Sequence, residues 1–249
     1  MTGLPLKKNW INWEDCWPTV VSWTWPFPVK EISERLTDLF FKEEYDFLLG
    51  SQQERIEGFY IRNGDWMTST ENGSTVYLQE GSKSGFFLLS GLVGVANKLM
   101  GSSTQEMLDN IQAYYYFPLA IAKNSEMADG SAQVQVKAIK GNIDRAGGLA
   151  FGLKNAGNYF VLRINALEDN VILFEYVNNK RFLRTSVKRK IDSDRWYGLK
   201  VEIKDQTIKC FIDNEFILEY KTEKSIKGYL GLWTKADSVT AFRKFSFNN

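Results

Sequence analysis

Alternation of side chains between residues 147 and 171 constrains the fold of this 249-residue chain more than any other feature. Successive side chains of a β-strand point to opposite faces of its sheet. A strand over 147–153 therefore has bulky apolar residues on one face and only glycine or alanine on the other. A second strand over 159–165 places Arg163 and Asn165 opposite its apolar side chains. We expect an antiparallel pair with one packed face and one face that has room for a polar ligand.

Similar short runs, separated by turn residues, continue to the end of the chain. Short strands at such intervals indicate an antiparallel sandwich or barrel, so the expected fold class is all-β. Nearer the N-terminus, Asn72-Gly73 predicts a tight hairpin between two further strands. The expected strands cover residues 59–69, 75–79, 113–121, 130–140, 147–153, 159–165, 171–177, 181–187, 196–204, 206–212, 215–220, 228–233 and 239–247.

The N-terminal part of the chain has a different composition. Residues 1–28 are rich in tryptophan and interrupted by proline, which predicts an irregular arm that packs on its own domain. Apolar residues at helical spacing predict a helix over 29–49. The expected organisation is an arm and helix in residues 1–56, packed on a sandwich formed by residues 57–249. An apolar insertion at 81–110 is expected to cover one edge of a sheet.

Charge and histidine content exclude several classes of function. The 31 basic and 30 acidic residues nearly cancel, so no long-range field favours nucleic acid. The chain contains no histidine, which excludes Ser-His-Asp and Cys-His catalysis and histidine metal ligands. Any acid–base chemistry must use carboxylates, lysine or tyrosine.

No segment is typical of a secretion signal or of a membrane span. The charged and proline-rich start lacks the apolar core of a signal peptide, and the longest apolar run is about half the length that a span needs. We therefore expect no membrane span and, by default, a cytoplasmic location. The sequence leaves the oligomeric state open.

Three blocks of sequence resemble one protein family. They are residues 144–149 (DRAGGL), 158–171 (NYFVLRINALEDNV) and 231–239 (GLWTKADSV). In this order they resemble the 3-keto-disaccharide hydrolase domain, formerly a domain of unknown function, over residues 114–247. The resemblance implies a concanavalin A/laminin-G-like jelly-roll β-sandwich whose concave sheet faces a carbohydrate. It also implies a secreted or periplasmic setting, in contrast to the default above.

The alternation of side chains agrees with a carbohydrate-binding face. In a strand over 228–233, Trp233 lies on the same side as Arg163 and Asn165, with Lys235 beyond it. An indole stacks on the C–H face of a sugar, and the polar groups bind its hydroxyls. In the structural alternative, Arg163 pairs with Glu175 across the sheet and Trp233 fills space. The candidate ligand-binding residues, with Arg145 taken from the first block, are Tyr159, Arg163, Asn165, Trp233, Lys235 and Arg145.

A hydrolase or lyase acting on glycosides, including 3-keto-disaccharides, is the alternative function. A retaining glycosidase needs two carboxyl groups roughly 5 Å apart. The Glu-x-Asp-x-Glu spacing of laminarinase-type jelly-roll enzymes is absent from the sequence. The pair to test is Glu175 with Asp237 or Asp169, where Glu175 is expected on the concave face.

We expect no cofactor, with calcium as the alternative. Calcium stabilises many laminin-G-like folds through loop oxygens, for which Asn142, Asp144 and Asp237 are the candidate ligands. The expected partner is an oligosaccharide or glycoside. A third possible function is a laminin-G-like module for protein interaction that uses the tryptophan-rich arm.

Overall fold

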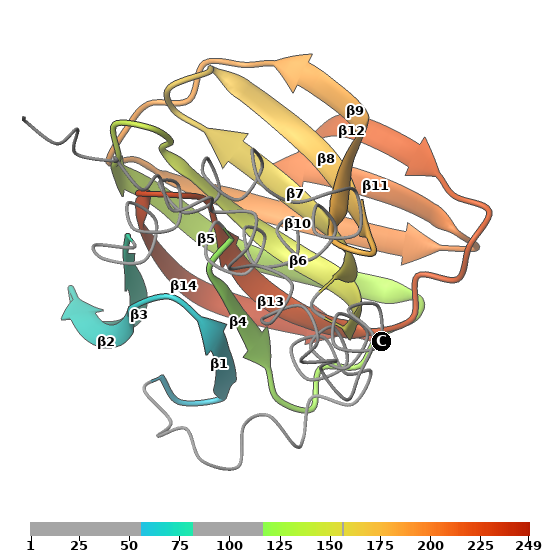
Figure 1. Ribbon diagram of the computed structural model, residues 1–249, viewed down its shortest axis with the longest axis horizontal. Helices are drawn as coiled ribbons and strands as arrows, with labels where there is room; N and C mark the ends of the chain where they lie inside the picture. Colours follow the sequence, from blue (N-terminus) through green and yellow to red (C-terminus); the bar gives the residue numbers. More distant parts are fainter. Residues whose placement is uncertain (1–55, 82–116, 156) are drawn as a thin grey trace, which may run out of the picture.

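The computed structural model describes residues 56–81, 117–155 and 157–249 (Figure 1). The predicted arm, the helix over 29–49 and residues 82–110 of the predicted insertion lie outside these residues. Within them, no helix is long and apolar enough to cross a membrane.

The described residues form two antiparallel seven-stranded sheets that face each other, which confirms the predicted β-sandwich (Figure 1). Sheet 1 has the order β1 (Phe59–Asn63), β4 (Leu119–Ala122), β13 (Tyr229–Thr234), β6 (Ala146–Asn155), β7 (Asn158–Asn165), β8 (Asn170–Val177) and β9 (Lys180–Lys188). Sheet 2 has the order β12 (Glu215–Lys221), β11 (Thr207–Ile212), β10 (Trp196–Lys204), β5 (Gly130–Lys140), β14 (Val239–Asn248), β3 (Ser74–Glu80) and β2 (Trp66–Glu71).

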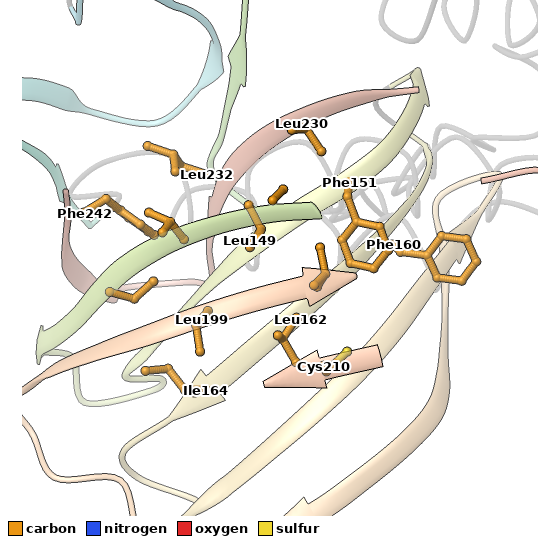
Figure 2. Packing of buried hydrophobic residues seen from close by; sticks show 14 of the residues in the cluster. Leu149, Phe151, Phe160, Leu162, Ile164, Leu199, Cys210, Leu230, Leu232 and Phe242 are labelled. Carbon is orange, nitrogen blue, oxygen red and sulfur yellow. The ribbon is translucent and has the colours of Figure 1, made fainter. Parts of the chain in front are cut away.

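The main core lies between the two sheets. Phe160, Leu162 and Ile164 of β7 enter it from sheet 1, and Leu199 and Cys210 enter it from sheet 2 (Figure 2). Full burial of one such aliphatic or aromatic side chain stabilises the fold by roughly 1.5–3 kcal/mol. The core thus takes up the even-numbered side chains of β7, as the alternation predicts.

The strand predicted over 59–69 is in fact two strands, and they belong to different sheets. The chain leaves sheet 1 after Asn63 and enters sheet 2 at Trp66. Gly64 between them has φ +90°, and a β-carbon there would lie 2.7 Å from Pro118 Cβ. Glycine is the residue that tolerates this left-handed backbone. The polar residues Asn63 and Asp65 flank Gly64 at the crossing from one sheet to the other.

The predicted Asn72-Gly73 hairpin is confirmed. Both residues have positive φ, 50° and 74°, between the paired strands β2 and β3. Two successive left-handed residues give the turn the twist that antiparallel strands require.

Candidate functional site

The register of sheet 1 gathers the candidate ligand-binding residues of β7 and β13 on one face. Trp233 lies opposite Gly148, and Gly148 lies opposite Arg163. Two residues further along, Ala146 lies opposite Asn165. Small residues of β6 therefore separate the large side chains of β13 from those of β7. We call this side, turned away from sheet 2, the outer face of sheet 1.

The outer face of sheet 1 is not an open groove, contrary to expectation. Trp233 is 0% exposed, Arg163 1% and Tyr159 3%. The Phe117 ring is stacked on Trp233, with centroids 5.5 Å apart, and Tyr159 is stacked on Tyr176 at 4.3 Å. Apolar neighbours on the same face make it a second hydrophobic cluster. The alternation predicted which residues share the outer face of sheet 1. The packing of these residues with Phe117 and Tyr176 closes that face to solvent.

Burial also determines the protonation state of Tyr159 in this cluster. Burial raises the pKa of the Tyr159 hydroxyl well above its ordinary value of 10, against smaller opposing effects of nearby polar and charged groups. Tyr159 is therefore neutral at physiological pH. It donates or accepts hydrogen bonds but supplies no charge.

A polar network closes the end of the outer face of sheet 1, where β6 begins and β7 ends. Asn165 Nδ2 donates to Asp144 Oδ1 at 2.8 Å, and the other oxygen of Asp144 forms an ion pair with Lys235. Asn165 Oδ1 accepts from the backbone N–H of Leu167 at 2.8 Å. One asparagine thus ties the turn after β7 to the residue that precedes β6.

Glu168 carries this network to the surface. Its Oε2 accepts from Arg163 Nη2 at 2.9 Å and from Asn170 Nδ2 at 2.9 Å, and its side chain is 46% exposed. Burial raises the pKa of Glu168, but hydrogen bonds from Asn170 and Arg163 and the nearby Lys235 charge outweigh it and lower the pKa. Glu168 is therefore an ionised acceptor at the mouth of the network. We call Asp144, Arg163, Asn165, Glu168, Asn170 and Lys235 the Asp144 network.

Asp237 stabilises the turn that precedes β6. Its two carboxylate oxygens accept the backbone N–H groups of Asn142, Ile143 and Asp144 at 2.7–3.2 Å. Burial raises the pKa of Asp237, but these N–H bonds outweigh it and lower the pKa. The oxygens that a calcium ion would need thus already accept hydrogen bonds. Within residues 56–81, 117–155 and 157–249, no three His, Cys, Asp or Glu side chains group as a metal site.

Arg145 points away from the Asp144 network. Its guanidinium donates to Ser193 Oγ at 2.6 Å and to the carbonyl of Gly141 at 3.1 Å. Arg145 thus stabilises the turn that precedes β6.

Glu175 does not lie on the outer face of sheet 1. It is opposite Phe160, whose side chain enters the main core, and its Oε2 accepts from Arg184 at 2.7 Å. The structural alternative for Arg163 is wrong for the same reason, since Arg163 pairs with Glu168. Glu175 is five residues along the strand from the end where Asp237 lies, a separation of roughly 17 Å. The two carboxyl groups are therefore too far apart to act as a pair.

Asp169 has a structural role in the turn between β7 and β8. It has φ +50°, its Oδ1 accepts the backbone N–H of Ile191 at 3.0 Å, and Lys190 lies 3.4 Å from Oδ2. The hydrogen bond from Ile191 is the main cause of its lowered pKa. Asp169 therefore fixes the contact between this turn and the segment after β9.

The sequence did not predict that Asp144 and Glu168 have central roles in the Asp144 network. It indicated Asp144 only as a candidate calcium ligand and did not single out Glu168. Asp144 lies inside the block 144–149 and Glu168 inside the block 158–171, and that was the one sequence signal for their role in the network. Lys235 is distant from Asp144 in sequence, so the pairing of β13 with β6 is needed to bring them together. Arg163 and Glu168 are close in sequence, and the turn between β7 and β8 brings them together.

Comparison with known proteins gives similarity of fold. No family model and no curated protein matches the sequence, so the resemblance to the 3-keto-disaccharide hydrolase domain stays a prediction. The structure is similar to the carbohydrate-binding module CBM66 from Bacillus subtilis, with TM-score 0.56 and 18% identity over 77% of this chain and 96% of that one. It is also similar to a protein of unknown function with a galectin-like fold from Bacillus subtilis, with TM-score 0.51 and 10% identity over 79% of this chain and 91% of that one. The chain is a jelly-roll β-sandwich of this galectin-like type.

Proposed function

We propose that this protein binds a carbohydrate at the Asp144 network, where the end of sheet 1 reaches the surface. The observation that carries the proposal is the convergence of two carboxylates, two carboxamides, a guanidinium and an ammonium from three separate segments of the chain, at 144, 163–170 and 235. A sugar hydroxyl both donates and accepts, so it is bound best by charged acceptors and donors placed side by side. Similarity of fold to a carbohydrate-binding module supports the same function.

Access to the network is limited to its rim. Glu168 is the exposed carboxylate, while Asp144 and Arg163 lie beneath it and hold their neighbours in place. Ile143 and Leu167 flank the rim and are 48% and 45% exposed. Aliphatic side chains beside a polar rim suit the C–H groups of a sugar ring. The ligand is thus expected to contact Glu168 and to leave Trp233 in its packed position.

The test is glycan-array screening followed by calorimetric titration of the wild type and of Glu168→Gln. Glutamine keeps an oxygen that can accept from Arg163 but removes the charge that strengthens a hydrogen bond to the sugar. Loss of a charge-assisted hydrogen bond, about 1.5–3 kcal/mol, predicts affinity at least about tenfold weaker.

Glu215→Gln is the matched control. Glu215 pairs with Arg189 at 2.8 Å, as Glu168 pairs with Arg163 at 2.9 Å, but it belongs to β12 of sheet 2. We expect its affinity for the glycan to equal that of the wild type. Equal affinity of Glu168→Gln and Glu215→Gln, or binding to no glycan on the array, would contradict the proposal.

Two finer expectations rest on the sequence resemblance. That the ligand is a 3-keto-disaccharide, and that the protein hydrolyses it, follow from the blocks 144–149, 158–171 and 231–239. The geometry gives hydrolysis less support than binding, because Glu175 lies roughly 17 Å along its strand from the end of sheet 1 where Asp237 lies. An assay with 3-keto-disaccharides tests both expectations, and turnover that survives in Glu175→Gln would rule out Glu175 as the catalytic carboxylate.

A further inference from the structure

A hollow of about 270 Å³ opens on the side of sheet 2 that is turned away from sheet 1. Its lining includes residues of β10, β5 and β14. These strands are neighbours in sheet 2 (Figure 1). Its polar lining comes from Gln133, Gln135, Lys200, Asp213, Asn214 and Lys244, and its floor includes Gly198. The Asp144 network belongs to sheet 1, so the two features are separate.

Two departures from regular strand structure create the hollow. Gly198 is opposite Gln135 and has no side chain to fill the sheet surface between β5 and the turn after β11. A bulge in β14 shifts the register between Arg243 and Ser246, and Lys244 within it has φ +52°. A bulge redirects the side chains of its strand. β10 thus leaves a gap at Gly198, and β14, on the other side of β5, turns the side chain of Lys244 outward.

Existing contacts orient the polar groups around the hollow. Gln133 Nε2 donates to Ser246 Oγ at 3.0 Å, which leaves its Oε1 to accept. Gln135 Oε1 accepts from Arg243 Nε at 2.7 Å, which leaves its Nε2 to donate. In each carboxamide, one polar atom is fixed by this hydrogen bond, and the other polar atom is left to bind a ligand. The hollow therefore has both a fixed acceptor and a fixed donor.

The charges around the hollow nearly balance. Asp213 Oδ1 accepts the backbone N–H of Gly198 at 2.8 Å, and its Oδ2 lies 3.5 Å from Arg195 Nη2. Lys200 pairs with Glu202 at 2.5 Å. A strongly charged ligand gains little from such a lining, whereas a neutral ligand that both donates and accepts can use each group.

We propose that this hollow is a second ligand-binding site, which takes a single neutral sugar residue. Its volume lies just below the range of roughly 300–1,000 Å³ that holds drug-sized ligands, so one sugar ring fits and a long ligand does not. Donors and acceptors in alternation match the hydroxyl groups of such a ring. A protein with this site and the Asp144 network would hold carbohydrate on both sides of the sandwich.

Amide NMR on the ¹⁵N-labelled full chain tests the proposal with glucose, galactose, fructose, xylose and their methyl glycosides as probes. We expect at least one probe to shift the amides of Gly198, Asp213 and Lys244 in a saturable manner. Shifts near Asn165 and Glu168 would instead report the Asp144 network. Each site can thus fail without the other.

Gly198→Gln is the variant that fills the hollow. A β-carbon at Gly198 has no neighbour nearer than 3.6 Å and its φ is not left-handed, so the larger side chain fits an ordinary strand position. We expect the melting temperature to stay within about 2 °C and the probe's affinity for the Gly198 site to fall at least about tenfold. Affinity at the Asp144 network should be unchanged.

Lys244→Asn is the second variant, for the case in which Gly198→Gln does not fold. Asparagine tolerates the positive φ of this position and removes the ammonium group. A weaker response at Gly198 and Asp213 supports the proposal. Absence of saturable shifts at these amides with every probe overturns it, as does a response that Gly198→Gln leaves intact.

Discussion

Lys235 forms an ion pair with Asp144 in which the carboxylate is 1% exposed and the lysine side chain 13% exposed. Asp144 has one further side-chain partner, Asn165, and its own backbone N–H is bound to Asp237. The pair therefore joins the segment after β13 to the start of β6.

Replacing Lys235 by methionine should destabilise the fold strongly. The change removes the positive partner of the buried Asp144 carboxylate and leaves the neutral carboxamide of Asn165 as its side-chain hydrogen-bond donor. Removal of one partner of a buried pair costs about 3–5 kcal/mol, and the slight exposure of Lys235 places this variant near the lower value. Urea denaturation at pH 7 measures the change in the free energy of unfolding.

Lys227→Met is the control for that measurement. Lys227 pairs with Glu126 at 3.4 Å, with both side chains more than half exposed. Exposed pairs contribute about 0–1 kcal/mol, so this variant should be close to the wild type. A loss in Lys235→Met no larger than in Lys227→Met would contradict the importance of the buried pair.

Asp237 should make the stability depend on pH below 5. Its pKa in the folded state lies below the ordinary value of 3.8, because backbone N–H bonds outweigh the effect of burial. A carboxyl group with a depressed folded pKa stabilises the native state above its unfolded pKa, and that contribution is lost as pH falls through the folded pKa. Asp237→Asn should lose about 1–2 kcal/mol at pH 7 and little at pH 2–3. Urea unfolding curves of the wild type and the variant at these two pH values test the prediction. An equal loss of stability at both pH values would show that the Asp237 charge does not contribute to stability.

Trp233→Ala should unfold or severely destabilise the protein, whatever its effect on sugar binding. The indole is fully buried under Phe117, and truncation of a buried aromatic residue costs about 3–5 kcal/mol. Phe182→Ala is the control, since Phe182 is 41% exposed and should change stability much less. The melting temperatures of the two variants, each compared with the wild type, test this prediction. A stable Trp233→Ala protein would show that the outer face of sheet 1 is open in solution.

Two glycines in the sheets should respond to alanine with opposite signs. A β-carbon at Gly148 would lie 2.6 Å from the carbonyl oxygen of Leu162, so Gly148→Ala forces the backbone apart and costs about 1–3 kcal/mol. A β-carbon at Gly198 meets nothing within 3.6 Å, so Gly198→Ala should stabilise by about 0.5 kcal/mol through lower entropy of the unfolded chain. Melting temperatures of the two variants provide the comparison. Similar losses in both variants would contradict this steric difference between the two positions.

The sequence determined the class of fold and the sides of its strands. Alternation over 159–165 predicted that Phe160, Leu162 and Ile164 enter the core, because a strand's period of two is fixed by the backbone. Asn72-Gly73 predicted its hairpin for a similar local reason, the need for positive φ. Such properties depend on neighbours in sequence and can be predicted from them.

Tertiary structure decided what each face is used for. Alternation cannot tell a solvated face from one that packs into a second cluster. Trp233 and Tyr159 are buried by Phe117, which precedes β4, and by Tyr176 of β8. Expecting Glu175 on the outer face of sheet 1 was wrong, because the register with Phe160 directs its side chain to the opposite face. Lys235 meets Asp144 only because β13 lies beside β6. Local backbone preferences set the strands, whereas contacts between distant strands set burial, charge pairing and hence the site.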